Sequence, residues 1–238
     1  MQSKTRNAIA LSLFLLSLGG AARAEDRPAV VELFTSQGCS SCPPADALLG
    51  ELARRGDVIA LAYHVDYWDY LGWKDPFASH AGTERQRLYA RGLGLSGIYT
   101  PQMVVDGAVD VVGSDRRSVL AALGGTRQGP GIQLLREDGK LKIAVAAQKE
   151  KGAQAAEVVL VAYADQAETK VQRGENAGRS LTEYAIVRAV YPLGRWSGDP
   201  TRFTIDLAAI APDATAVAVL VQSPGPGRIL GAAKTAIR

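Results

Sequence analysis

Apolar and polar positions alternate with two different periods along the first half of the chain. Apolar runs at residues 30–35 and 57–65 are bounded by turn residues, which is typical of buried strands. Residues 43–55, 81–91 and 115–123 carry apolar positions at helical spacing, and glycine follows each segment. The pattern predicts alternating strands and helices.

A hairpin is predicted between two of these helices. Residues 102–105 and 109–112 are apolar runs, and Asp106-Gly107 between them favours a tight turn. The segment at 66–79 (DYWDYLGWKDPFAS) is aromatic and irregular, and it interrupts the alternation as an insertion.

The second half of the chain has only strand-like patterns after a linker at 126–131. Residues 132–137 and 140–147 flank an Asp138-Gly139 turn, which predicts another hairpin. Further strand-like runs follow at 157–164, 181–190, 202–207, 215–222 and 229–236. About seven short strands without a helical period predict an all-β sandwich of immunoglobulin-like size at 130–238. We expect a structural or partner-binding role for it, and its polar loop 172–180 is the stretch able to reach back to the first domain.

The first 24 residues have the pattern of a signal peptide. Lys4 and Arg6 precede an apolar run at 8–18, and Ala22-Arg23-Ala24 forms a small-x-small cleavage site. We therefore expect an exported protein, periplasmic or secreted, whose mature chain begins at Glu25. No later segment is apolar for long enough to span a membrane.

Removal of that segment changes the charge balance. The whole chain has 27 Lys and Arg against 24 Asp and Glu, a net charge of +3. Three of the basic residues lie in 1–24 and none of the acidic ones, so 24 of each remain. A formally neutral chain gives no reason to expect nucleic acid or an anionic membrane as a partner.

Both cysteines of the chain stand in one C-x-x-C motif, between a predicted strand and a predicted helix. Cys39 and Cys42 then lie at a helix N-terminus, where free N–H groups and the helix dipole stabilise a thiolate. A structural disulfide and a metal site are the alternatives. A structural zinc site takes about four ligands, whereas this chain has no second cysteine pair and only His64 and His80. Export would also allow a disulfide to persist, and the motif favours redox chemistry.

Several stretches resemble an uncharacterised, exported family of thioredoxin-like proteins, and the order of strands and helices is that of the thioredoxin fold. The similar stretches are ELFTSQGCSSCPPAD at 32–46, HVDYWDYLGWKDPF at 64–77, ERQRLYA at 84–90 and YTPQMVVDG at 99–107. The resemblance implies an α/β thioredoxin-like domain at 25–126, followed by the β-sandwich, and implies no substrate. Ordinary thioredoxins have Trp-Cys-Gly-Pro-Cys, whereas here Gly38 replaces the Trp and Ser40-Ser41 the Gly-Pro.

The same resemblance assigns roles to individual residues. Cys39 would attack as the exposed thiolate, and Cys42 would resolve the mixed disulfide. Pro101 would be cis, and the backbone of Thr100 would pair with an extended substrate. Glu32, a charge inside an apolar strand, is the candidate acid behind Cys42, with an exposed edge position as the alternative.

The aromatic insertion is expected to cover the site, with Trp68 and Trp73 available to bind a peptide. His64 ends the second strand, and we expect Asp66 or the backbone to satisfy it. The alternative is a Cu(I) site made of Cys39, Cys42 and His64.

Together these features predict a thiol–disulfide oxidoreductase that acts on protein thiols with an unidentified redox partner and no cofactor. The rivals are a copper-handling module and a redox-inactive interaction protein whose disulfide is structural.

Overall fold

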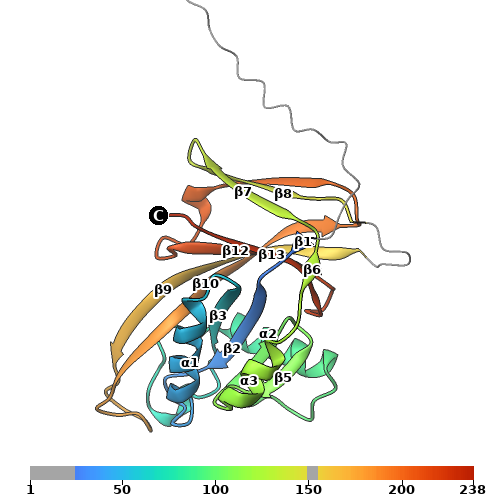
Figure 1. Cartoon of the computed structure of the whole chain (residues 1–238). Helices are drawn as coiled ribbons and strands as arrows, with labels where there is room; N and C mark the ends of the chain where they lie inside the picture. The colour runs from blue at the N-terminus through green and yellow to red at the C-terminus, as the bar shows by residue number, and fades with distance from the viewer. Residues whose placement is uncertain (1–24, 149–154) are drawn as a thin grey trace, which may run out of the picture.

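A large mixed sheet forms the body of the protein in the computed structural model, which describes residues 25–148 and 155–238. The predicted signal peptide at 1–24 lies outside the described residues. The sheet has eight strands in the order β13-β12-β9-β10-β3-β2-β4-β5 (Figure 1). Their bounds are β2 Ala29–Thr35, β3 Val58–His64, β4 Gln102–Val105, β5 Val109–Val112, β9 Ala156–Lys170, β10 Ser180–Trp196, β12 Ala216–Gln222 and β13 Ile229–Ala236. Strand β3 is parallel to both β2 and β10, and the remaining neighbours are antiparallel.

Three helices accompany the N-terminal strands. They are α1 (Pro43–Ala53), α2 (His80–Gly92) and α3 (Arg116–Ala122). Helix α2 begins at a Ser79 cap, whose hydroxyl oxygen accepts from the Gly82 N–H at 3.1 Å. No helix in the described ranges is long and apolar enough to cross a membrane.

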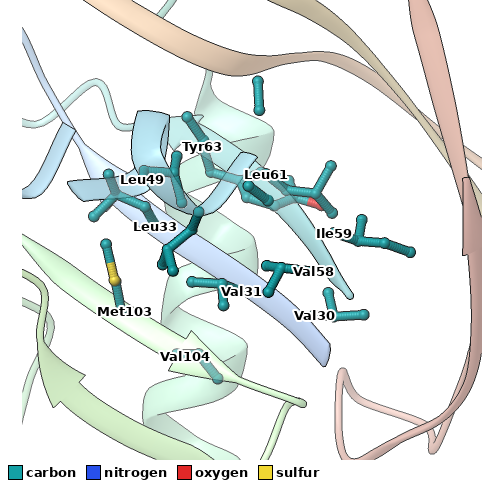
Figure 2. Packing of buried hydrophobic residues seen from close by; sticks show 14 of the residues in the cluster. Val30, Val31, Leu33, Leu49, Val58, Ile59, Leu61, Tyr63, Met103 and Val104 are labelled. Atoms are coloured by element: carbon teal, nitrogen blue, oxygen red, sulfur yellow. The ribbon is translucent and has the colours of Figure 1, made fainter. Parts of the chain in front are cut away.

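Helices α1 and α2 lie on opposite faces of β2. Thr35 in β2 bonds to α1, whereas Phe34 packs its ring edge-to-face on Tyr89 of α2, with ring centroids 6.0 Å apart. Both β2 and β3 are buried along their whole length, and Figure 2 shows side chains of both strands, among them Leu33 and Leu61, with Met103 of β4 near Leu33. Strands buried on both faces read as continuous apolar runs, which explains why the sequence predicted these two well.

A smaller sheet covers the far end of the large one. It consists of β7 (Ile132–Glu137), β8 (Lys140–Val145) and β11 (Thr201–Asp206) in the order β11-β8-β7. Two short strands, β1 (Glu25–Asp26) and β6 (Gln128–Gly129), pair beside it. Two short 3₁₀ helices occur at Asp69–Leu71 and Leu207–Ala209.

The expectation of an α/β thioredoxin-like domain followed by a separate β-sandwich is wrong. Strand β10 pairs with β3 at Ile186 and Ala62, so the C-terminal strands extend the N-terminal sheet instead of forming a second unit. Two hydrophobic cores share strands β9 and β12. Val159 and Val161 face the core of the N-terminal helices, while the alternate Val158 and other residues face the core under the small sheet. The strands themselves were largely predicted, but their placement was not.

Candidate redox site

Cys39 and Cys42 are joined in a disulfide between the end of β2 and the start of α1, with their Cα atoms 5.4 Å apart. Cys42 is the N-cap of α1, and prolines occupy the first helical positions. Its carbonyl oxygen accepts from the N–H groups of Ala45 at 2.8 Å and Asp46 at 3.1 Å. The pair therefore lies at a helix N-terminus, as the sequence predicted.

Both cysteines are buried, contrary to the expectation that Cys39 faces outward. Cys39 is 1% exposed and Cys42 is fully buried, whereas Ser40 and Ser41 between them are exposed. A substrate cannot reach either sulfur unless the cover over it moves.

The cover is the loop at 171–179 that connects β9 to β10, here called the covering loop. The side-chain Nδ2 of Asn176 donates to the carbonyl oxygens of Gln37 at 2.9 Å and Cys39 at 3.0 Å. The Glu175 carboxylate accepts from the Ser40 N–H at 3.2 Å. The long β9–β10 hairpin brings this loop past α1 (Figure 1). The sequence had marked this polar loop as able to reach the site, and it does.

The insertion contributes two tryptophans to the same place. Trp68 Nε1 donates to the Thr100 hydroxyl at 2.8 Å, and Trp73 Nε1 donates to Gln37 Oε1 at 2.8 Å. Trp68 also lies on Gly38, where an added Cβ would be 2.9 Å from the Trp68 Cβ. The residue before Cys39 is therefore glycine because the tryptophan occupies the space of a side chain.

The Thr100–Pro101 peptide bond is cis, as predicted. Pro101 is buried, and it meets the first turn of α1 around Gly113. A Cβ added to Gly113 would be 3.3 Å from the Pro101 Cβ and 3.2 Å from the Ala45 Cβ. Thr100 and Pro101 thus lie beside the helix that begins at Cys42.

Glu32 is the predicted site residue that the structure does not bring to the cysteines. It is fully buried in β2, but its side chain points to the α2 face, where Arg85 Nε lies 2.6 Å from its carboxylate. The Tyr89 hydroxyl also donates to it. Because the Glu32 carboxylate lies on the opposite face of β2 from Cys42, it cannot exchange a proton with that cysteine.

Four other ionisable side chains gather on the α1 face. Asp46 lies one helical turn after Cys42, and its carboxylate accepts from the Thr35 hydroxyl at 2.8 Å. His64 Nδ1 donates to Asp75 Oδ2 at 2.7 Å. In the sequence-based hypothesis Asp66 satisfied His64, but Asp66 instead bonds to residues of α2.

Gln37 joins this group to β10. Its backbone N–H donates to Asp75 at 2.8 Å, and its side-chain Nε2 donates to Glu183 of β10 at 3.1 Å. All of these side chains are buried. We call Asp46, His64, Asp75 and Glu183 the buried acid cluster.

The environment of the buried acid cluster shifts the pKa values of its two carboxyls Asp46 and Glu183 toward neutrality. Burial raises the pKa of Asp46 to about 6, although His64 and Thr35 oppose the rise. Burial raises the pKa of Glu183 to about 7, again opposed by His64. Burial alone would lower the pKa of His64, but the carboxylates around it raise the pKa overall. Burial would raise the pKa of Asp75, yet His64 and two backbone N–H groups hold it below its ordinary value. The cluster can therefore hold or release a proton near neutral pH, close to Cys42.

The possible metal ligands near the cysteines are not arranged as a binding site among the described residues. In residues 25–148 and 155–238, no group of three or more His, Cys, Asp or Glu side chains is arranged to hold an ion. The two cysteines are bonded to each other, and His64 Nδ1 is engaged by Asp75. His64 Nε2 is buried without a hydrogen-bond partner in the described chain.

Sequence reasoning missed Asp46, Asp75, Glu183 and Asn176. Asp46 was detectable, because the fourth residue after a helix N-cap lies one turn above it. Asn176 belongs to the polar loop that the sequence analysis had marked, although the residue itself was not named. Asp75 and Glu183 reach the site only through the insertion and the β10 pairing, for which the sequence carries no local signal.

Comparisons with known proteins place the chain in a family. The model of a family described as a protein of unknown function (DUF1223) matches residues 30–222. The chain belongs to the DUF1223 family. A search of curated proteins finds no match.

Two solved structures are similar to this DUF1223 protein. The X-ray crystal structure of protein AGR_C_4864 from Agrobacterium tumefaciens is 35% identical, with a TM-score of 0.76. The match covers 88% of this chain and 94% of that one. HBP35 of Porphyromonas gingivalis is 15% identical with a TM-score of 0.61, over 88% of this chain and 75% of that one, and shows a similar fold alone.

Proposed function

We propose that this DUF1223 protein is a thiol–disulfide oxidoreductase that acts on protein thiols. One observation carries the proposal: a Cys39–Cys42 disulfide at a helix N-terminus, with a carboxyl of near-neutral pKa one turn away at Asp46. An inert staple across a three-residue separation constrains the unfolded chain little and needs no proton donor beside it. The cis-proline at Pro101 and the two tryptophans give the pair a defined surrounding.

The reaction begins when a substrate thiolate attacks the Cys39 sulfur. The Cys39–Cys42 bond breaks, a substrate–Cys39 disulfide forms, and Cys42 leaves as a thiolate. Asp46 in its protonated form supplies the proton that Cys42 takes up, and the rest of the buried acid cluster replaces it from solvent. A second substrate thiolate then attacks the substrate sulfur and releases Cys39 as a thiolate, which takes a proton from solvent. Two substrate thiols are oxidised to a disulfide, and the protein pair gains two electrons and two protons.

The same steps in reverse reduce a substrate disulfide, and the reduction potential of the pair decides the direction. We place the reaction outside the cytoplasm, in the periplasm or in the medium, because the signal-like segment at 1–24 favours export. A disulfide persists in those compartments.

Covalent trapping tests this proposal. Cys42→Ser removes the resolving thiol, so Cys39 should remain linked to its substrate when the variant is expressed in its own compartment. Non-reducing gels should show adducts that reductant releases and that are absent from the Cys39→Ser/Cys42→Ser variant. Absence of adducts, together with a wild-type pair that neither oxidises nor reduces dithiol peptides, would refute the assignment.

A second candidate follows from the burial of both sulfurs. A disulfide closed off by the covering loop also suits a redox-inactive interaction protein, in which the bond only fixes the β2–α1 turn. Equilibration with glutathione buffers separates the two functions. A redox-active pair titrates within the range of such buffers, at about −180 to −270 mV, whereas structural disulfides lie below about −300 mV.

A further inference from the structure

A cavity of about 640 Å³ lies away from the redox site. It forms where the β4–β5 turn, β6, the end of β10 and the start of β13 meet, and Asp106, Gly129, Trp196 and Leu230 are among its walls. Arg27, which also lines it, precedes β2, while Cys39 follows that strand. The seven residues of β2, about 23 Å of extended chain, therefore separate the cavity from the disulfide. Small-molecule sites occupy about 300–1,000 Å³ and favour such junctions.

Three residues of the cavity wall have a buried polar atom without a hydrogen-bond partner in the described chain. These atoms are Trp196 Nε1, Arg27 Nε and Gln148 Oε1. Trp196 is 6% exposed and the Arg27 side chain is 8% exposed, so both polar atoms are shielded from the outer surface of the protein. An unpaired buried donor or acceptor costs about 1–3 kcal/mol, and folded proteins leave few of them. Their concentration around one cavity indicates a missing partner molecule.

The charge of the wall favours an anion. Arg27 and Arg127 both bind the Asp106 carboxylate, so this trio carries one positive charge. Arg228 adds another at the rim, where it is exposed and forms no ion pair with another described residue, and Asp199 supplies the opposing carboxylate. Two of the three unpaired atoms are N–H donors, which suit a carboxylate oxygen.

Another part of the wall is apolar and aromatic. Val105, Pro130, Ile229 and the Trp196 ring supply surface for a hydrocarbon or ring group. Gln148 Oε1 can accept from a hydroxyl on the same molecule. We propose that this cavity binds a small organic carboxylate with an apolar body and a hydroxyl group, a function separate from the redox chemistry.

Calorimetric titration with mandelate tests the site, because mandelate has a carboxylate, a hydroxyl and a phenyl ring. Its neutral analogue mandelamide should bind at least about tenfold more weakly, which corresponds to one lost charge-assisted contact. Arg228→Gln and Trp196→Phe should each weaken mandelate binding about tenfold. Arg54→Gln, an exposed arginine at the C-cap of α1, is the matched control and should leave binding unchanged.

Two further measurements make the outcome decisive. Trp196→Phe should lower the melting temperature of the free protein only by the packing that the smaller ring loses, because the lost N–H had no partner. Cys39→Ser/Cys42→Ser should bind mandelate as the wild type does, so failure of the redox proposal leaves this one standing. Undetectable binding at millimolar mandelate, equal binding of mandelamide, or affinity unchanged in both cavity variants would overturn the proposal. Ordered water alone on the three atoms in a crystal grown with mandelate would do the same.

Discussion

At the scale of single residues, the position of a buried carboxylate decides whether it has a structural role or can take part in the proposed reaction. Glu32 and Asp46 are both buried near the middle of the molecule, yet they lie on opposite faces of β2. Glu32 is neutralised by Arg85, whereas Asp46 has a hydroxyl partner and a pKa raised to about 6 by burial. Side chains alternate along β2, so Glu32 faces α2, and a shift of one residue would turn it to the face on which Asp46 of α1 lies.

Asp46→Asn should slow thiol–disulfide exchange about 100-fold at neutral pH, because the variant has no proton to give to Cys42. Stopped-flow kinetics with a dithiol peptide would measure it across pH. A rate equal to that of the wild type would show that Asp46 is not the proton donor.

The same variant should change how stability depends on pH. The Asp46 pKa rises from 3.8 to about 6 on folding, so its protonated form stabilises the fold below pH 3.8, and this stability is lost as pH rises through about 6. Relative to the wild type, Asp46→Asn should therefore gain up to about 3 kcal/mol in unfolding free energy between acidic and neutral pH. Urea unfolding of the oxidised proteins at both ends of that range measures the difference.

Glu32→Gln should lower the stability of the protein and leave its exchange rate unchanged. It leaves the buried Arg85 without its carboxylate, so the free energy of unfolding should fall by about 3–5 kcal/mol. The exchange rate of the folded variant should stay at the wild-type value, since Glu32 does not face the cysteines. A large rate change with little loss of stability would contradict this assignment of roles.

At the scale of elements, the sequence predicted most helices and strands within a few residues, because their apolar periods are strong. Strands β4, β5, β7 and β13 have the predicted bounds. Strands β9 and β10 were predicted too short, at 157–164 and 181–190 instead of Ala156–Lys170 and Ser180–Trp196. The parts that were missed carry polar, exposed residues such as Glu168 and Arg195, and only the pairing of the two strands extends them.

The covering loop makes a testable contribution to reactivity. Asn176→Ala removes two hydrogen bonds to the segment at Cys39, each worth about 0.5–1.5 kcal/mol. Reduction of the disulfide by a small thiol should therefore become about tenfold faster, as judged by mass spectrometry after alkylation. Gln172→Ala, an exposed position in the same loop, should have no effect. Equal rates in all three proteins would show that the loop does not limit access.

At the scale of the whole molecule, the continuous eight-stranded sheet is the feature that could not be predicted from the sequence. Apolar runs such as VVLVAYA at 158–164 were interpreted as half-buried sandwich strands, although strands buried on both faces have this composition. Nothing local states that β10 will lie beside β3, because this pairing joins residues more than 120 positions apart.

A chain restricted to residues 25–126 should fail to fold. It would lose β10 beside β3 and expose the core that Val159, Val161 and Leu220 close. Circular dichroism and proton NMR should show an unfolded or aggregated fragment, while residues 25–238 unfold in a single transition. A fragment with dispersed amide resonances would contradict this and restore two independent units.

The positions of the three tryptophans should make intrinsic fluorescence a reporter of both proposed sites. Trp68 and Trp73 touch the segment that leads into Cys39, whereas Trp196 lies in the cavity wall. A disulfide quenches a nearby excited indole by accepting an electron, so emission from Trp68 and Trp73 should rise when the bond is reduced. Trp68→Phe/Trp73→Phe should abolish that rise and leave a fluorophore that responds to mandelate alone. Tryptophan fluorescence of the unlabelled protein would then distinguish reduction of the disulfide from ligand binding in the cavity.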